Sequence, residues 1–260
     1  MKDFRTKKSL GQNFIYDTNF LESILDKLNI SKTDTVIEIG TGPGTLTVCI
    51  AKRARSVITY EIDKRLEDTL KQQFAGLKNV QLVFKDALEV TDFPPDFLLV
   101  ANIPYYITTP IILKFLSEPR CREICILVQD EVARRIVAKP GTKDYGALSV
   151  TVQARADCKI IRAVPRGIFR PVPKVDSAFV TIKKVQARQV PLDTFDTLVK
   201  GMFAARRKTC LNALKQVMPE QETEKVLVEC GIDPTCRPEQ VTVEKFVKLS
   251  QYLSQFDNKK

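Results

Sequence analysis

The sequence predicts an α/β protein with a doubly wound, mostly parallel sheet, an antiparallel strand pair that closes it, and a small all-helical C-terminal domain. Between residues 35 and 138, short apolar runs alternate with stretches of helical periodicity, which is the pattern of βαβ units. From residue 192 onward only the helical periodicity remains. These two patterns of hydrophobic periodicity predict two domains, residues 1–188 and 189–260, with a boundary near 185–191.

The elements of the first domain follow in order. Asp17 is a typical N-cap, and the apolar residues between Phe20 and Leu28 share one face of the helix behind it. Apolar runs predict strands at residues 35–39, 56–60, 80–84, 97–101 and 124–128. Helices are expected between them at residues 45–53, 64–74, 110–116 and 131–138.

The alternation of predicted strands and helices ends after Pro140-Gly141. Residues 148–156 and 177–184 are rich in β-forming side chains, so we expect them to form the closing antiparallel pair. The stretch "RGIFRPVPKVD" between them is basic and proline-rich, which is typical of a surface loop. The helices of the second domain are expected at residues 195–205, 206–217, 222–230 and 243–255.

The positive charge is clustered. Of the net charge of +10, residues 2–8 contribute +3 and residues 155–188 contribute +7. Such clusters favour a polyanion partner, nucleic acid above all, and a merely solvated basic surface is the alternative.

The cysteine content indicates the cellular compartment, and the histidine content limits the catalytic chemistry that the chain can perform. The seven cysteines are odd in number and no secretory signal precedes them, so a reduced, cytoplasmic setting is expected. No apolar run approaches the roughly 20 residues that span a bilayer, so no membrane association is expected. The chain has no histidine, which excludes histidine-based catalysis and the usual zinc sites, and no metal is expected.

The stretch "VIEIGTGPGTLT" predicts a strand, a tight glycine turn and the start of a helix. Glycines in such a turn let the backbone approach a ligand closely. Glu61 ends the next strand, 21 residues after Gly40, which suits a carboxylate that binds ribose hydroxyls. Asp86 ends the third strand and can accept a hydrogen bond from an adenine amino group.

The two acids, with no lysine nearby, suit a ligand that has ribose, adenine and a positive charge but no phosphate. S-adenosylmethionine fits this description. NAD fits less well, because Pro43 lies inside the turn and the third glycine comes one residue earlier than in the dinucleotide fingerprint.

The stretch "VANIPYYITTP" leaves the fourth strand of the expected sheet at its carboxyl end, where ligands bind in such folds. Pro104 holds Ile103 extended and leaves the Ile103 carbonyl free, and the Asn102 side-chain carbonyl can point alongside it. Two such acceptors can hold an amino group and stabilise the positive charge that grows on its nitrogen as a methyl group arrives. Tyr105 can stack under the base that carries the amine. Packing beneath the site is the default interpretation for Tyr106.

These motifs, in this order, resemble the rRNA adenine N6-dimethyltransferase family, and in particular its KsgA-type small-subunit branch. The motifs that carry the resemblance are "KSLGQNF", "EIGTGPGTLT", "YEID", "KDAL", "NIPYYITTP", "YGALSV", "FRPVPKVDSAF" and "FAARRKTCLNAL". The resemblance as a whole covers the chain from about residue 7 to beyond residue 245. The resemblance implies the Rossmann-like sheet of class I S-adenosylmethionine-dependent methyltransferases.

The resemblance also implies roles for residues at matching positions. Asn13 and Ile15 would close over the methionine end of the cofactor, and Ile62 and Ala87 would pack against its adenine. The remaining cofactor contacts would come from Gly40, Thr41, Gly42, Glu61, Asp86 and Asn102. The catalytic set would be Asn102, Ile103, Pro104, Tyr105 and Phe169, with Phe169 stacking on the target base opposite Tyr105. The phosphates would be held by Lys7, Lys8, Arg162, Arg166, Arg170, Lys174, Arg206 and Arg207.

The family's substrates imply the partners. They are two neighbouring adenosines in a loop near the 3′ end of small-subunit (16S) rRNA, each methylated twice, so small-subunit rRNA and the assembling small ribosomal subunit are the expected partners of a monomer. Three alternatives stay open: an Erm-type enzyme acting on large-subunit rRNA, a DNA adenine methyltransferase, and a non-catalytic nucleic-acid-binding relative. "YGALSV" and "FRPVPKVDSAF" argue against the first, Ile103 against the second, and the intact cofactor motifs against the third.

Overall fold

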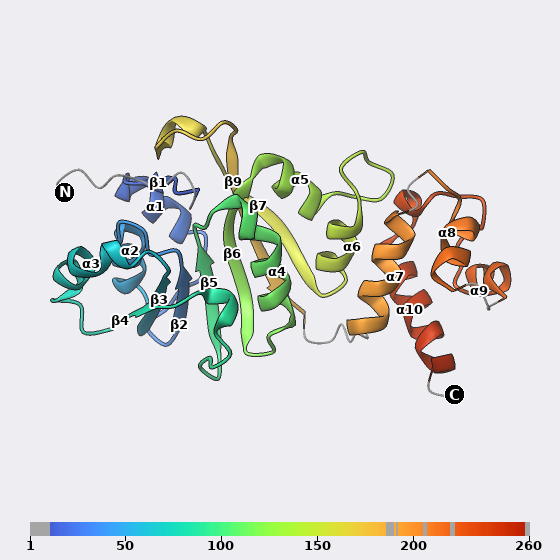
Figure 1. Ribbon diagram of the computed structural model, residues 1–260, viewed down its shortest axis with the longest axis horizontal. Helices are drawn as coiled ribbons and strands as arrows, with labels where there is room; N and C mark the ends of the chain where they lie inside the picture. The colour runs from blue at the N-terminus through green and yellow to red at the C-terminus, as the bar shows by residue number, and fades with distance from the viewer. Residues whose placement is uncertain (1–10, 186–189, 191, 205–206, 219–221, 258–260) are drawn as a thin grey trace. The chain divides into compact units, whose positions relative to one another are not determined.

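A seven-stranded sheet organises the larger part of the chain (Figure 1). The computed structural model describes all residues except 1–10, 186–189, 191, 205–206, 219–221 and 258–260. In spatial order the strands are β4 (Val80–Phe84), β3 (Ser56–Glu61), β2 (Thr35–Ile39), β5 (Phe97–Ala101), β6 (Cys121–Gln129), β9 (Ser177–Lys184) and β7 (Ala156–Val164). A two-stranded sheet pairs β1 (Phe14–Ile15) with β8 (Phe169–Arg170).

The strand order reverses between β2 and β5. The chain runs from β2 outward through β3 to β4, then returns to the other side of β2 with β5 and β6. These five strands are parallel, and β9 then pairs with β6 in antiparallel register, as in Ile126↔Val180. In doubly wound sheets, ligands bind outside the carboxyl ends of the strands at such a reversal.

Both central strands are buried on both faces, because helices cover each side. All five residues of β2 and all five of β5 are buried. Alternate side chains of β5 face opposite ways: Leu98 and Val100 join the core that includes α1 and α2, while Phe97 packs edge-on against Phe115 of α4, with ring centroids 6.0 Å apart. This continuous apolar pattern is typical of a parallel sheet.

The helices around the sheet begin and end near the residues that the sequence predicts. Asp17 caps the first helix as expected, since its carboxylate accepts from the Phe20 amide at 2.9 Å. The helices are α1 (Thr18–Leu25), α2 (Thr45–Ala51), α3 (Glu67–Phe74), α4 (Thr108–Ser117) and α5 (Asp130–Val137). Short 3-10 turns lie at η2 (Lys64–Leu66), η3 (Ala87–Glu89), η4 (Tyr105–Ile107) and η5 (Arg166–Ile168).

The helical part has its own apolar core. Phe195, Met202 and Phe246 are fully buried in it, and Phe203 stacks on Phe246 with ring centroids 5.7 Å apart. Its elements are α6 (Ala147–Gln153), α7 (Leu192–Ala204), α8 (Cys210–Val217), α9 (Thr223–Glu229), η6 (Pro238–Gln240) and α10 (Val243–Asp257). Within the described residues, no helix is long and apolar enough to cross a membrane.

The chain divides into two compact units that are not simply successive in sequence. One unit holds the residues up to Ala133 together with Lys159–Lys184, and the other holds Arg134–Cys158 and the residues from Val185 onward. The break at residue 185 lies next to the expected boundary. Residues 134–158, which the sequence analysis assigns to the first domain, group instead with the helices because α6 packs against α7.

The predicted strand at residues 148–156 is wrong. Residues 148–153 lie in helix α6, and the strand that neighbours β9 is β7, which begins only at Ala156. The Ser149 hydroxyl donates to the Arg135 carbonyl at 2.5 Å, and the Gln153 amide donates to the carbonyls of Ile136 and Ala138, each at 2.8 Å. These bonds and the burial of Val150 and Val152 stabilise a helix against the β propensity of its residues.

Candidate functional site

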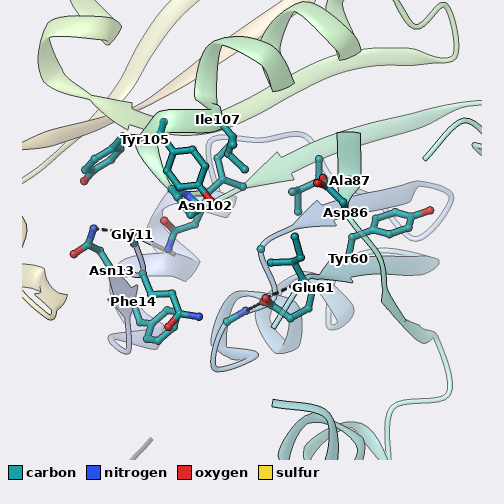
Figure 2. A pocket seen from close by; sticks show the side chains of 18 of the residues that line it. Gly11, Asn13, Phe14, Tyr60, Glu61, Asp86, Ala87, Asn102, Tyr105 and Ile107 are labelled. Atoms are coloured by element: carbon teal, nitrogen blue, oxygen red, sulfur yellow. Dashed lines mark hydrogen bonds between the residues drawn. The ribbon is translucent and has the colours of Figure 1, made fainter. Parts of the chain in front are cut away.

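A pocket lies at the carboxyl ends of the parallel strands, at the place where the strand order reverses (Figure 2). Its walls come from the residues that follow β2, β3, β4 and β5, and from the segment before β1. Glu61, Asp86 and Asn102 line it together, although they are far apart in sequence. Figure 2 shows Asn102 and Tyr105 on one side of this pocket, and Asp86 and Ala87 on the other.

The glycine turn after β2 forms one wall. Gly40 and Gly42 have positive φ angles of 81° and 53°, and a Cβ at Gly40 would lie 2.8 Å from the backbone oxygen of Asn102. A Cβ at Gly42 would lie 2.9 Å from the ring of Phe14. Other residues would therefore strain the turn and push against its neighbours.

Thr41, expected among the cofactor contacts, does not line the pocket. Its side chain is buried, and its hydroxyl hydrogen-bonds that of Thr59 on β3 at 2.6 Å. The turn directs this hydroxyl under the glycines, where it helps to hold them. The Thr41 side chain therefore does not reach the pocket, and a cofactor contact through the Thr41 backbone stays a prediction.

Glu61 lies at the end of β3 with its carboxylate fixed from several sides. One oxygen accepts from the Gly42 amide at 2.8 Å, and the other accepts from the amides of Ile62 and Asp63 at 2.9 and 2.8 Å. Burial raises the pKa of Glu61, and the three amides oppose that rise. The carboxylate is thus rigidly placed beside the glycine turn and still faces the pocket.

Asp86, Ala87 and Ile62 form the opposite end. One Asp86 oxygen caps η3 by accepting from the Leu88 amide at 2.8 Å. Ala87 is buried and Ile62 is 57% exposed, so Ile62 is not a core residue and offers an apolar surface to the pocket. Lys85 also lines the pocket, so the premise that no lysine is near the two acids was wrong.

The "NIPYY" stretch begins directly after β5. Asn102, Ile103, Pro104 and Tyr105 all line the pocket. The Tyr105 hydroxyl hydrogen-bonds that of Ser177, the buried first residue of β9, at 2.8 Å, which fixes the ring. Tyr106 is 65% exposed at the pocket, where it lies near Gly11, so the expectation that it packs beneath the site is wrong.

The segment before β1 crosses from one side of the pocket to the other. The Gln12 amide donates to Asp63 at 3.0 Å, and a Cβ at Gly11 would lie 3.3 Å from Pro104. Asn13 lines the pocket, with its amide donating to the Gly11 carbonyl at 3.2 Å. Ile15, expected to close over the cofactor, is instead buried in the core below, because strand alternation turns it away from the side of Phe14.

Phe169 does not reach the pocket. It belongs to β8, opposite Ile15 of β1, and its side chain is 0% exposed within the core. In this conformation it cannot stack on an incoming base, and its expected role opposite Tyr105 is corrected to core packing. Pairing of two two-residue strands decides this position, and no sequence periodicity indicates it.

The basic residues expected to bind RNA are exposed where the structure describes them. Arg162, Arg166, Arg170, Lys174 and Arg207 have exposed side chains. Arg162 also lies over the ring of Phe20, 5.5 Å from its centroid. Lys7, Lys8 and Arg206 lie outside the described residues.

A buried acid that the sequence analysis missed lies beneath the glycine turn. One oxygen of Glu38 on β2 accepts from the hydroxyls of Thr47 and Thr59, at 2.5 and 2.6 Å. Its other oxygen has no hydrogen-bond partner among the described residues. Complete burial raises the pKa of Glu38 to about 8. The position of Glu38 inside an apolar strand, two residues before Gly40, is the signal that could have identified it.

Other pocket residues escaped the sequence analysis as well. Gly11, Gln12, Phe14, Ile39, Tyr60, Lys85 and Ile107 all line the pocket. Most of them adjoin a residue that the motifs do identify, such as Asn13, Glu61 or Asp86. Gly11 and Ile107 are the exceptions: Gly11 lies two residues before Asn13, and Ile107 lies three residues after Pro104, one turn along η4.

The pocket fits S-adenosylmethionine. Glycines that admit no Cβ form one wall beside a fixed carboxylate suited to ribose, and an apolar slot flanked by Asp86, which suits adenine, lies at the opposite end. Carbonyl, carboxylate and aromatic groups around the pocket suit a positively charged ligand. Together with the strand order and the antiparallel β9, these features define the chain as a class I S-adenosylmethionine-dependent methyltransferase.

Comparison with known proteins gives the family. The family model "Ribosomal RNA adenine dimethylase" matches residues 3–255, and the chain belongs to that family. It is 42% identical to "Ribosomal RNA small subunit methyltransferase A" of Geobacillus kaustophilus (strain HTA426), covering 96% of this chain and 92% of that protein. Identity to the protein of the same name from Alkaliphilus oremlandii (strain OhILAs) is 41%, with coverage of 97% and 93%.

Solved structures of methyltransferases share the fold of this chain. A dimethyladenosine transferase from Plasmodium falciparum superposes with a TM-score of 0.84 at 27% identity, covering 95% of this chain and 98% of that chain. The 23S rRNA methyltransferase ErmE gives a TM-score of 0.74 at 29% identity, with coverage of 94% and 100%.

Proposed function

We propose that this protein transfers methyl groups from S-adenosylmethionine to the N6 amino groups of two adjacent adenosines near the 3′ end of small-subunit (16S) rRNA, giving N6,N6-dimethyladenosine. The observation that carries the proposal is the position of the Asn102–Tyr105 stretch. It leaves the carboxyl end of β5 directly into the pocket that fits the methyl donor.

Residues of this chain would hold the donor along the pocket. Glu61 would accept hydrogen bonds from the ribose hydroxyls, and Asp86 would accept one from the adenine amine, with Ile62 and Ala87 against the ring. Gly40 and Gly42 would let the backbone lie close to the methionine part, with Asn13 at the pocket's N-terminal wall. The bound donor supplies a methyl group made electrophilic by its sulfonium.

The target amine would be held by oxygen acceptors at the end of β5. The Asn102 side chain and the Ile103 carbonyl would each accept one N–H of the adenine amine, leaving the nitrogen lone pair directed at the methyl group. Because both acceptors are fixed in place, they stabilise the positive charge that grows on the nitrogen at no cost of reorganisation. The anchored ring of Tyr105 would stack on the base.

The RNA would be held by exposed positive charge. An adenine must leave its stack to react, at a cost of a few kcal/mol that is lower in a loop. We assign phosphate contacts to Arg162, Arg166, Arg170 and Lys174, and further contacts to Arg207 of the helical C-terminal domain. Lys7, Lys8 and Arg206, expected from the sequence to share this role, lie outside the described residues.

The choice of the small subunit rests on the relatives. The proteins at 41–42% identity are named for the small subunit, whereas ErmE, named for 23S rRNA, is 29% identical. The motifs "YGALSV" and "FRPVPKVDSAF" support the same choice. A cytoplasmic location and a monomer acting on the assembling subunit belong to this proposal.

One experiment tests the proposal. Purified protein and labelled S-adenosylmethionine are incubated with small subunits that lack the modification, and the product is mapped by mass spectrometry. We expect dimethylation of two adjacent adenosines near the 3′ end of the small-subunit rRNA. Fully methylated small subunits are the control and should accept no label. Unmethylated large subunits are offered in a parallel reaction, and label in their rRNA with none in the small subunits would support an Erm-type activity instead and would refute the proposal.

A further inference from the structure

Two free cysteines of the helical unit lie side by side. The sulfurs of Cys210 and Cys236 are 3.5 Å apart and share a hydrogen bond, although the residues are 26 positions apart in sequence. Cys210 is the first residue of α8, and Cys236 lies in the loop between α9 and η6.

The backbone holds the two residues together independently of the sulfurs. The Cys210 amide donates to the Cys236 carbonyl at 2.7 Å, and the Leu211 amide donates to the Pro234 carbonyl at 3.0 Å. The loop is itself fixed by Asp233, whose carboxylate accepts from the Thr235 amide and hydroxyl at 2.8 and 2.7 Å. A disulfide bond is about 2.05 Å long, so the sulfurs need to approach by about 1.5 Å, which side-chain rotation can supply.

The two thiols differ in access. Cys210 is fully buried, and burial together with the neighbouring Cys236 raises its pKa. Cys236 is half-buried, so its sulfur is the one that a reagent in solution reaches first. An accessible thiol beside a buried second thiol is the arrangement in which an oxidised cysteine is resolved to a disulfide.

We propose that Cys210 and Cys236 are a site of reversible oxidative modification that takes hydroperoxides as oxidant and low-molecular-weight thiols as reductant. The Cys236 thiolate attacks hydrogen peroxide, the O–O bond breaks, and Cys236 becomes a sulfenic acid as hydroxide leaves. The Cys210 sulfur then attacks the sulfenic sulfur. The S–S bond forms, the S–O bond breaks, and the displaced hydroxide takes the Cys210 proton to form water. Two thiols and one peroxide thus give one disulfide and two waters.

The disulfide would join the start of α8 to the 233–236 loop at a basic part of the surface. Arg207 and Lys208 lie just before Thr209, the N-cap of α8, Arg237 directly follows Cys236, and all three side chains are exposed. Oxidation would therefore fix the spacing of positive charges in the helical unit. The inference itself does not depend on the proposed rRNA substrate.

The test uses the full-length protein treated with a small excess of hydrogen peroxide, followed by alkylation of remaining thiols and peptide mapping by mass spectrometry. We expect a peptide pair joined through Cys210 and Cys236, lighter than the reduced pair by two hydrogens and separated again by dithiothreitol. Cys236 converted to sulfinic or sulfonic acid, with Cys210 still open to alkylation after unfolding, would overturn the proposal.

Two variants sharpen the result. In Cys210→Ser, which removes the resolving thiol, Cys236 should proceed to the higher oxidation states under the same treatment. In the matched control Cys158→Ser, which removes the other half-buried cysteine, the Cys210–Cys236 disulfide should form at the wild-type rate. Loss of the disulfide in the control would mean that Cys158 is the first thiol oxidised, which also overturns the proposal.

Discussion

At the scale of single residues, Asn102 combines two demands that few side chains meet: a fixed carbonyl acceptor and a position at the end of a buried strand. Replacing it with alanine removes one preorganised polar group from the proposed target-amine site. We expect Asn102→Ala to lower the methyl-transfer rate by about 10²–10³-fold. Single-turnover transfer of labelled methyl to rRNA measures the effect.

The binding of rRNA by Asn102→Ala should persist, since the exposed cations are unchanged. Asn19→Ala, at an exposed position on α1, is the matched control and should transfer methyl groups at the wild-type rate. Turnover by Asn102→Ala within a few-fold of wild type would contradict the assignment of Asn102.

Glu38 predicts a pH dependence of stability. Burial raises its pKa from an ordinary 4.5 to about 8, with Glu61 acting in the same direction and the hydroxyls of Thr47 and Thr59 opposing it. The folded state therefore binds this proton more tightly than the unfolded state, so the contribution to stability is complete below about pH 4.5 and is lost as the pH rises to about 8. The difference between these two pKa values sets an upper limit of about 5 kcal/mol on this contribution to stability.

Urea denaturation from about pH 5 to about pH 8 checks this prediction. Glu38→Gln mimics the protonated acid, and its free energy of unfolding should lack the decline that the wild type shows with rising pH. Glu131→Gln, at an exposed position on α5, should retain the wild-type decline. Parallel curves for Glu38→Gln and the wild type would show that Glu38 does not carry this dependence.

A site residue can be predicted from the sequence when the strand pattern alone determines where its side chain lies. Glu61, Asp86 and Asn102 follow strand ends, and parallel strands bring their carboxyl ends to one edge, so their common location follows from the strand pattern. Ile15, Thr41 and Phe169 lie within or beside short elements whose facing is decided by distant partners, Phe169, Thr59 and Ile15 respectively. No local pattern indicates those pairings.

At the scale of elements, the geometry of the glycine turn after β2 allows us to predict how one added methyl group changes stability and cofactor binding. Alanine at position 40 would adopt a φ near 81° and place its Cβ 2.8 Å from the backbone oxygen of Asn102. The left-handed conformation costs about 1–2 kcal/mol, and relief of the contact would move the backbone of Asn102. We expect Gly40→Ala to lower the free energy of unfolding by at least that amount and to weaken S-adenosylmethionine binding.

Calorimetric titration with S-adenosylmethionine and urea denaturation measure both effects for Gly40→Ala. The matched control is Gly76→Ala, where an added Cβ would meet nothing within 4 Å and no positive φ is required. Equal affinity and stability in the two variants would mean that the turn tolerates a side chain, contrary to its geometry.

Helix α6 shows where element prediction fails. Its residues Ser149 to Val152 are buried one after another, so the burial pattern has neither the helical nor the strand period. The helix follows from tertiary bonds to the Arg135 and Ile136 carbonyls, which the sequence cannot place. The strands β2 and β5, which are mostly apolar and are bounded by glycine or polar residues, were predicted to the residue.

At the scale of the whole molecule, composition indicated a basic protein and hydrophobic periodicity indicated two parts, and the structure adds which residues belong to each. The break at residue 185 coincides with a change of texture that periodicity detects. Residues 134–158 belong to the helical unit because α6 packs against α7, which is a contact between residues far apart in sequence. The sequence pattern therefore locates the last crossing between the units and misses the two earlier ones, after Ala133 and after Cys158.

The clustered charge leads to a prediction about salt. Arg166, Arg170 and Lys174 lie on one exposed stretch, and each phosphate contact on single-stranded RNA contributes about 0.7 to the slope of log affinity against log salt concentration. Replacing all three with glutamine should reduce the magnitude of that slope by about 2, since three contacts are lost.

The matched control replaces Lys64, Lys71 and Lys78, which are also exposed but lie on and beside α3, and should leave the slope unchanged. Filter binding of the rRNA fragment over a range of salt concentrations measures both slopes. Because the two variants lose the same net charge, a reduction confined to the first would locate the RNA at the 166–174 stretch, whereas equal slopes in the two variants would place it elsewhere.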